Sequence, residues 1–124
     1  MDEKIKVLLV EDDPFLSSMY TTKFKMEGFE IYSANDGKTG LNLAVSEKPD
    51  IILLDIMIPE MTGFEVLEEL KKREDTRDIP VILLTNLSQK DEVEKGLELG
   101  AEEYVIKAYI TPTGMVDKIK SRFN

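Results

Sequence analysis

Four short apolar runs in this chain each end at a polar position. The four pairs of run and polar residue are Val7–Val10 with Glu11 and Asp12, Ile51–Leu54 with Asp55, Val81–Leu84 with Thr85, and Tyr104–Ile106 with Lys107. Short apolar runs separated by helical patterns are typical of parallel strands that are buried on both faces. Ligands of such sheets bind at the carboxyl ends of the strands. We therefore expect these carboxylates, the hydroxyl and the ammonium group to converge at one edge of one sheet.

Between these runs the pattern changes to helical spacing, so the chain alternates strand and helix. The predicted strands are Ile5–Val10, Phe29–Ser33, Ile51–Leu54, Ile79–Leu84 and Tyr104–Ile106. A helix is expected after each strand, with starts at Asp13-Pro14, Asp36, Ser88 and Thr111-Pro112, and with Phe64, Leu67 and Leu70 marking the third helix after a loop that holds Pro59 and Gly63. Alternation of this kind requires right-handed crossovers and helices on both faces of the sheet. The fold class is therefore α/β, a five-stranded parallel doubly wound sheet of the flavodoxin-like order 2-1-3-4-5 with five helices.

Caps and apolar spacing define the first and last helices best. Asp13 and Thr111 each precede a proline, which is typical of an N-cap followed by the first helical residue. The first helix carries apolar residues at helical spacing, namely Phe15, Leu16, Met19, Tyr20 and Phe24, and Gly28 is its expected stop. In the last helix the stripe Met115, Val116, Ile119 and Phe123 is predicted to face the sheet.

Composition narrows the possible functions. With 124 residues we expect a single domain over residues 1–124. A net charge of −9 makes direct binding to nucleic acid or to an anionic membrane unfavourable, because phosphate groups are bound by Lys and Arg. The chain has no cysteine and no histidine, so thiolate and imidazole chemistry are excluded. The apolar runs are too short to span a bilayer, and we expect a cytoplasmic location.

The residues at the strand ends suit phosphoryl chemistry, although each has an ordinary structural interpretation. Adjacent carboxylates repel unless a cation lies among them, and Mg2+ prefers oxygen ligands, so Asp12 is a candidate metal ligand. Asp55 is the candidate nucleophile, since a carboxylate can attack phosphorus and form an aspartyl phosphate. Alternatively, Asp55 could hydrogen-bond its own turn, and Lys107 could form a structural salt bridge with Asp55. Thr85 could equally be an ordinary threonine at a strand end.

Taken together, these residues resemble the receiver domain of two-component response regulators, and the resemblance covers essentially the whole chain. The matching segments are 7–13 (VLLVEDD), 49–59 (PDIILLDIMIP), 63–65 (GFE), 80–85 (PVILLT) and 100–107 (GAEEYVIK). No segment is specific alone, but the set in this order is a strong signal. The resemblance implies that the chain takes a phosphoryl group from a sensor histidine kinase or a phosphotransfer protein.

The resemblance also implies a metal site around the phosphoacceptor, Asp55. Asp12 would bind Mg2+ directly, and Glu11 would act mainly through a metal-bound water. The backbone carbonyl of Met57 would be a further ligand. Mg2+ would offset the repulsion between the Asp55 carboxylate and an incoming phosphoryl group.

On the phosphoryl side of the site, the resemblance implies that Thr85 and Lys107 each contact a phosphoryl oxygen. Tyr104 matches the aromatic residue that turns inward when Thr85 moves toward the phosphoryl group. The added charge would change partner binding at the face formed by the fourth helix, fifth strand and fifth helix. The protein would be a monomer or a phosphorylation-linked homodimer, and its downstream target is a protein that the sequence does not identify.

Two positions depart from the family pattern. Proline usually follows the lysine, with a cis peptide bond, whereas Ala108 follows Lys107 here. A cis bond before a non-proline residue costs about 2.5–4 kcal/mol, so a trans bond is an alternative at this position. A small residue usually follows the threonine, but Asn86 is larger and could contact the phosphoryl group or crowd a phosphodonor. We expect a phosphoryl group that lasts longer than in fast chemotaxis-type receivers.

Two other functions compete with a phosphorylated switch. A pseudo-receiver would use the same fold as an interaction domain without phosphorylation, but Asp12, Asp55 and Lys107 are all present. A phosphatase with an aspartyl nucleophile would typically carry a second Asp two residues later, where this chain has Met57. We therefore expect no turnover of external substrates. The chain is expected to be either a stand-alone regulator or the receiver of a longer protein.

Overall fold

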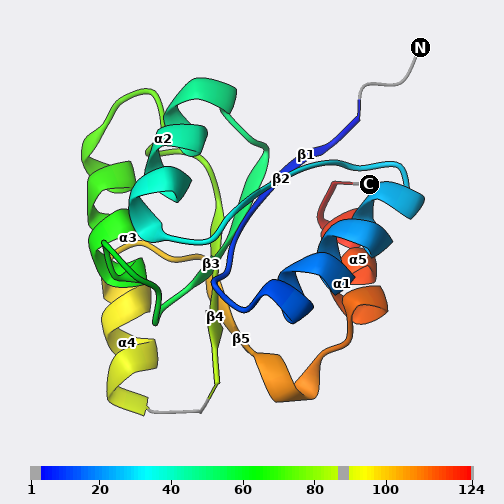
Figure 1. The fold of residues 1–124 in the computed structure, drawn as a ribbon. Coiled ribbons are helices and arrows are strands. Elements are labelled where there is room, and N and C mark those ends of the chain that lie inside the picture. The colour runs from blue at the N-terminus through cyan, green and yellow to red at the C-terminus, as the bar shows by residue number, and fades with distance from the viewer. Residues whose placement is uncertain (1–3, 87–89, 124) are drawn as a thin grey trace.

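A five-stranded parallel sheet forms the centre of the computed structural model, which describes residues 4–86 and 90–123 (Figure 1). The strands are β1 (Lys6–Val10), β2 (Glu30–Ala34), β3 (Ile51–Asp55), β4 (Val81–Thr85) and β5 (Glu103–Ile106). Their order in the sheet is β2-β1-β3-β4-β5, and all four pairings are parallel. The predicted fold class and strand order are confirmed.

Five helices cover the two faces of this sheet. They are α1 (Pro14–Met26), α2 (Gly37–Glu47), α3 (Gly63–Lys72), α4 (Lys90–Glu98) and α5 (Pro112–Phe123), with a 3-10 turn over Lys107–Tyr109. Helices α1 and α5 lie on one face, and α2, α3 and α4 lie on the other (Figure 1). Every crossover therefore returns the chain to the same sheet edge, so the carboxyl ends of all five strands lie together.

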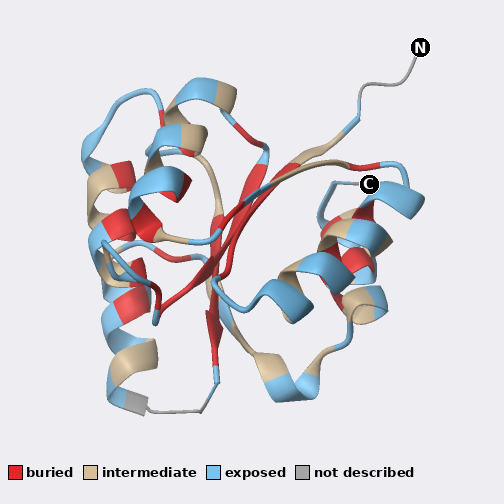
Figure 2. Cartoon of the chain, in the orientation of Figure 1, coloured by how far each residue is buried: buried red, intermediate tan, exposed pale blue. Residues whose placement is uncertain are grey.

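The central strands are buried on both faces (Figure 2). In β1, Val7 and Leu9 pack in one hydrophobic cluster with residues of α1 and α5. Leu8 and Val10 pack in a second cluster, with residues of α2 and α3 on the opposite face. Because side chains alternate along a strand, the uninterrupted apolar runs supply both clusters.

Side-chain caps start the helices where the sequence predicted. The Asp13 carboxylate accepts hydrogen bonds from the N–H groups of Phe15 and Leu16, and Asp36 accepts from the N–H of Thr39. Thr111 accepts from the N–H of Gly114 at 3.0 Å. These contacts satisfy amides that have no partner within the helix. The predicted cap at Ser88 lies outside the described residues.

Each strand differs from its predicted bounds by one or two residues at an end: β1 begins at Lys6, β3 ends at Asp55 and β5 begins at Glu103. The second strand was expected over Phe29–Ser33 but runs from Glu30 to Ala34. The fourth was expected from Ile79 but begins at Val81, because Pro80 has no N–H to donate to the ladder. The Pro80 carbonyl still accepts from the N–H of Ile52 at 3.0 Å, so it aligns β4 with β3.

Some apolar residues with helical spacing are exposed and do not join the core. Phe15 and Met19 of α1 and Leu97 of α4 are exposed. Phe123 is also exposed, so the prediction that it faces the sheet is wrong. In α4, Gly96 is the buried residue, and a Cβ there would lie 2.2 Å from Leu83 Cδ1. The helix therefore approaches β4 through a glycine, which turns Leu97 outward.

The loop after β3 is held close to the strand end by Gly63. A Cβ on Gly63 would lie 2.4 Å from the carbonyl oxygen of Asp55 and 2.7 Å from Ile56 Cα. The Gly63 N–H donates to the carbonyl of Ile56 at 2.8 Å. The start of α3 is further fixed by a capping box between Thr62 and Glu65. This close approach sets the position of the backbone that carries Asp55.

We predict that Gly63→Ala lowers the free energy of unfolding by about 1–3 kcal/mol, because a methyl group there must displace backbone. Urea unfolding of the purified chain measures this change. Gly114→Ala in α5 is the matched control, since its nearest neighbours are side-chain atoms of Ile110 and Thr111 at 3.1 and 3.4 Å. Ala also favours the helix over Gly by up to about 1 kcal/mol. Equal losses in the two variants would contradict the close approach.

Candidate functional site

Carboxylates from two neighbouring strands meet at the carboxyl edge of the sheet. Glu11 and Asp12 follow β1, and Asp55 is the last residue of β3. The pairing of Val10 with Leu54 places these strand ends side by side. One carboxylate oxygen from each of the three residues lies within 4.8 Å of the others. The predicted convergence of these three side chains is therefore confirmed.

Lys107 bridges the two buried carboxylates of this group. Its Nζ donates a hydrogen bond to Asp55 Oδ2 at 2.8 Å and lies 2.6 Å from Glu11 Oε1. The second contact is ionic, since Oε1 receives no aligned hydrogen bond. Glu11 Oε2 accepts from the N–H of Asp13 at 3.0 Å. Lys107 thus links the segment after β5 to the ends of β1 and β3.

The site carries more negative charge than its one ammonium group balances. Burial raises the pKa of Glu11 above its ordinary value, and the nearby Asp55 carboxylate raises it further, against contacts with Lys107 and Asp13 that lower it. Burial alone would lower the pKa of Lys107, but contacts with Asp55 and Glu11 outweigh it and raise that pKa. The ammonium therefore stays charged, and a further cation is favoured among the carboxylates.

The donor set fits a hard divalent cation. All three converging groups are carboxylates, and Glu11 Oε1 is a buried oxygen without a hydrogen bond. Asp12 is exposed, so the cluster is open to solvent on one side. Oxygen ligands with an open side suit Mg2+, which keeps several of its waters when it binds to proteins.

Asp55 is nearly enclosed, with 3% of its surface exposed. Its Oδ1 accepts from the N–H of Met57 at 3.2 Å, while Oδ2 accepts from Lys107. The turn at Met57 thus fixes one carboxylate oxygen and the lysine fixes the other, and the Met57 side chain is exposed. The structural alternatives named for Asp55 and Lys107 are both present, and both hold the carboxylate in one orientation.

Thr85, Asn86 and Tyr104 lie farther along the sheet, toward β5. Thr85 is buried at the end of β4, and Asn86 beside it is exposed. The register pairs Leu83 with Tyr104 and Thr85 with Ile106, so Tyr104 and Thr85 lie on the same face of the sheet. The Tyr104 side chain is 38% exposed, so it lies in an outward position and not in the core.

The peptide bond between Lys107 and Ala108 is trans, as are all peptide bonds of the described residues. Lys107 begins the 3-10 turn that leads to α5, and its ammonium still reaches Asp55. Sequence reasoning missed the ion pair between Lys107 and Glu11 and the hydrogen bond from Asp13 to Glu11. No local signal reveals them, because both depend on how far a Glu side chain reaches into the folded site.

Residues 7–120 match the family model described as response regulator receiver domain. The chain belongs to this family. It is 38% identical over 104 residues to "DNA-binding dual master transcriptional regulator RpaA" of Synechocystis sp., covering 84% of this chain and 43% of that protein. It is also 38% identical over 109 residues to "Probable transcriptional regulator ycf27" of Guillardia theta, covering 88% and 42%. The chain spans less than half the length of these relatives.

Solved structures show the same fold. The chemotaxis protein CheY4 of Vibrio cholerae superposes with a TM-score of 0.88 at 25% identity, covering 96% of this chain and 98% of that one. The receiver domain of the sensor histidine kinase PA1611 from Pseudomonas aeruginosa gives 0.85 at 25% identity, covering 97% of each chain. That structure has a magnesium ion coordinated in its active site cleft. Within the described part of this chain, no helix is long and apolar enough to cross a membrane.

The raised pKa of Glu11 has a consequence for stability. A folded-state pKa above the ordinary value of 4.5 means that the folded protein holds this proton more tightly than the unfolded chain. The contribution of Glu11 to the free energy of unfolding is fully present below pH 4.5, and it is lost as pH rises through the folded-state pKa. We predict that, without Mg2+, Glu11→Gln gains stability relative to the original protein as pH rises from 4 upward, measured by urea unfolding.

Glu27 provides a control of opposite sign. Hydrogen bonds from Lys120 and Lys23 lower the pKa of this partly exposed carboxyl group. Its stabilisation is present above the ordinary pKa and is lost as pH falls through the folded-state value. Glu27→Gln should therefore lose stability relative to the original protein as pH rises over the same range. The same sign of pH dependence in both variants would refute the burial argument.

Proposed function

We propose that this chain accepts a phosphoryl group on Asp55 in a Mg2+-dependent reaction and then changes its affinity for a partner. The observation that carries the proposal is the Asp55 carboxylate, fixed by Lys107 and the Met57 N–H beside the carboxylates of Glu11 and Asp12. The donor is a histidine kinase or a phosphotransfer protein. Receiver domains of this family act with such kinases, and the matched fold and residues support the same role here.

In the proposed step, an Asp55 carboxylate oxygen forms a bond to phosphorus while the phosphorus–nitrogen bond of a phosphohistidine breaks. The released imidazole keeps the electron pair of that bond and takes up a proton. Lys107, already beside Asp55, balances charge on one phosphoryl oxygen, and the Thr85 hydroxyl donates to another. Asn86 borders the same space. Positioning and charge stabilisation are the main requirements of phosphoryl transfer, so no further acid or base is needed.

Glu11, Asp12, Asp55 and the carbonyl of Met57 are the groups that would hold Mg2+. When bound, the ion neutralises carboxylate and phosphoryl charge in the site. The protein residues keep the site in shape: Asp13 fixes Glu11 through its N–H, and Met57 fixes Asp55. Because the ion offsets the excess negative charge described above, it also favours entry of an anionic phosphoryl group.

The phosphodonor and the output partner have separate candidate surfaces. Phe15 and Met19 leave apolar side chains exposed on the first turns of α1, which begins at the end of the sheet that carries the site. On the far side, a groove of about 530 Å3 along β5 is bordered by Leu97, Tyr104 and other residues up to Lys118. Phosphorylation adds about −1.5 to −2 charge near Thr85, which would bias the position of Tyr104.

The alternatives to this proposal are a pseudo-receiver and a domain that contacts nucleic acid directly. A pseudo-receiver would keep the fold without the reaction, and only a phosphorylation assay separates the two. The name of one relative, RpaA of Synechocystis sp., includes DNA binding, so our expectation of no nucleic-acid contact is not confirmed. We propose that any such contact belongs to a part of the protein outside this chain, since the chain itself has a net charge of −9. We also propose that it turns over no external substrate.

We predict that incubation with acetyl phosphate and Mg2+ adds one phosphoryl group per chain, detected by intact mass. Asp55→Asn should show no addition because it lacks the nucleophilic carboxylate. A sample with the metal chelated should also show none. Decay of the added mass gives the phosphoryl lifetime, for which the longer lifetime expected from Asn86 remains a prediction.

The outcome that opposes this proposal is a folded, Mg2+-binding protein that acquires no phosphoryl group from acetyl phosphate or from a phosphorylated histidine kinase. That result would establish a pseudo-receiver. Addition to both the original protein and Asp55→Asn would instead move the acceptor to another residue.

The metal site has a test that does not depend on phosphorylation. Mg2+ at one hundred times its dissociation constant should raise the free energy of unfolding by about 2.7 kcal/mol, because it binds only the folded chain. Asp12→Asn should lose most of this gain, since it removes the exposed carboxylate ligand. Asp75→Asn, a carboxylate paired with Arg73 and Lys48 far from the cluster, is the control and should keep the gain. A gain of equal size in Asp12→Asn would exclude this ligand set.

A further inference from the structure

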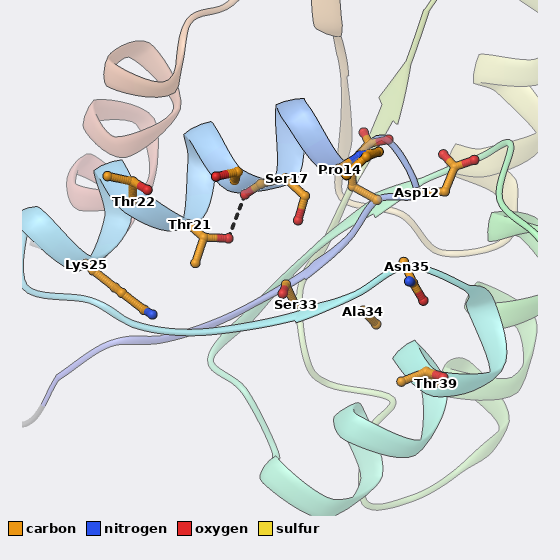
Figure 3. Close-up of a pocket in the computed structure, with 12 residues that line it drawn as sticks. Asp12, Pro14, Ser17, Thr21, Thr22, Lys25, Ser33, Ala34, Asn35 and Thr39 are labelled. Atoms are coloured by element: carbon orange, nitrogen blue, oxygen red, sulfur yellow. Dashed lines mark hydrogen bonds between the residues drawn. The ribbon is translucent and has the colours of Figure 1, made fainter.

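A groove of about 680 Å3 runs along the outer edge of β2, between α1 and the start of α2 (Figure 3). Its α1 wall carries small hydroxyl residues and one lysine, namely Ser17, Ser18, Thr21, Thr22 and Lys25. Asn35 and Thr39 line the α2 side, and the groove ends at Asp12. Apart from its acidic end, the groove has no part in the proposed phosphoryl chemistry.

The groove stays open because short polar side chains occupy positions where larger apolar side chains would fill it. Ile31 and Ser33 are on the same face of β2, the face that α1 covers. Ile31 packs against the core, but Ser33, which pairs in register with Leu9, is exposed. Ser17 and Thr21 on α1 point toward this strand (Figure 3), and Thr21 donates its hydroxyl to the Ser17 carbonyl at 2.6 Å. These short side chains leave the strand edge accessible.

The floor of the groove is an unpaired strand edge. In the sheet, β2 is the end strand and pairs only with β1. The Glu30 N–H donates to Ile5, and the Ala34 carbonyl accepts from Glu11, so these residues direct their backbone groups toward β1. Alternate residues of a strand direct theirs to the opposite side. The N–H and C=O groups of Ile31 and Ser33 therefore face away from β1, and Ser33 lines the groove, so this edge is a template for another strand.

We propose that an extended segment of a partner polypeptide binds in this groove as a sixth strand, antiparallel to β2. Antiparallel pairing is slightly more stable per residue than parallel pairing, and the charges at the two ends of the groove then set the order of charged residues in the segment. Lys25 lies at the end of the groove where β2 begins, and Asp12 lies where β2 finishes. In an antiparallel segment, a basic first residue lies beside Asp12 and an acidic last residue lies beside Lys25, so each charge meets its opposite. Five extended residues span about 16 Å, which matches the five residues of β2.

In this arrangement the backbone of the segment supplies most of the affinity, and its side chains supply selectivity. Hydroxyl groups of α1 can donate to or accept from polar side chains on one face of the added strand. The proposal does not depend on phosphorylation of Asp55, because the strand edge and Lys25 are outside that reaction, and chelating the metal leaves the shared residue Asp12 uncoordinated. Failure of one proposal is therefore distinguishable from failure of the other.

The test uses the full chain with the metal chelated and a pentapeptide, acetyl-Arg-Thr-Val-Thr-Glu, as the probe. Amide hydrogen exchange is followed by NMR at Ile31 and Ser33. Strand addition should slow exchange at both amides by about threefold or more at saturation, because their N–H groups become hydrogen-bonded. The amides of Glu30 and Ala34, which face β1, should change little. The same residues in the reverse order should bind more weakly.

Ser33→Pro and Ser33→Ala form the matched pair of variants. Proline removes an N–H that faces the groove and leaves the pairing with β1 in place, which an edge strand tolerates. Alanine keeps that N–H and removes only the hydroxyl. We expect Ser33→Pro to weaken binding by about tenfold or more, with Ser33→Ala close to the original protein. Lys25→Glu, which leaves the backbone unchanged, makes both ends of the groove acidic and should abolish the preference between the two peptide orders.

Two results would overturn the proposal. One is unchanged exchange at Ile31 and Ser33 at millimolar peptide, and the other is equal binding by Ser33→Pro and Ser33→Ala. Equal binding of both peptide orders to the original protein would refute the antiparallel direction. If Ser33→Pro does not fold, the exchange data and Lys25→Glu still decide the outcome.

Discussion

One ammonium group shared between two buried carboxylates is the interaction on which the site depends. Lys107, Glu11 and Asp55 come from the ends of three strands, so their contacts join segments far apart in the chain. A buried carboxylate without a partner is strongly unfavourable, and Lys107 partners two of them. One positive charge does not balance three carboxylates, however. The site therefore holds its shape while it still favours a cation, and this property suits an acceptor for phosphoryl groups.

The sheet makes this contact possible by fixing where each strand ends. The apolar residues of β1 and β3 are buried on both faces, and their register is set by the two cores that they join. A slip of one residue would exchange the residues that belong to each core and would move Asp55 away from Glu11. Gly63 contributes from the other side, because its lack of a side chain lets the following loop lie against Asp55.

The two edges of the sheet carry different surfaces. Along β5, exposed residues such as Tyr104 and Leu97 border an open groove. Along β2, the groove is lined with hydroxyl groups and ends at Asp12. The β2 groove includes Glu11 and Asp12 of the acidic site, whereas along β5 the other groove reaches only to Ile106, the residue before Lys107. If Asp55 is phosphorylated as proposed, the added charge would act through Thr85 toward β5 and through Asp12 toward β2.

The sequence by itself determined the strand order, the helix starts at Asp13, Asp36 and Thr111, and the convergence of Glu11, Asp12 and Asp55. These features follow from local spacing and from the rule that parallel strands end together. Tertiary structure decided the rest. It paired Glu11 with Lys107, placed Gly96 against the sheet instead of Leu97, and left the edge of β2 uncovered. Such features depend on side-chain reach and on the rotation of each helix against the sheet, which the packing of distant residues sets and which no local pattern contains.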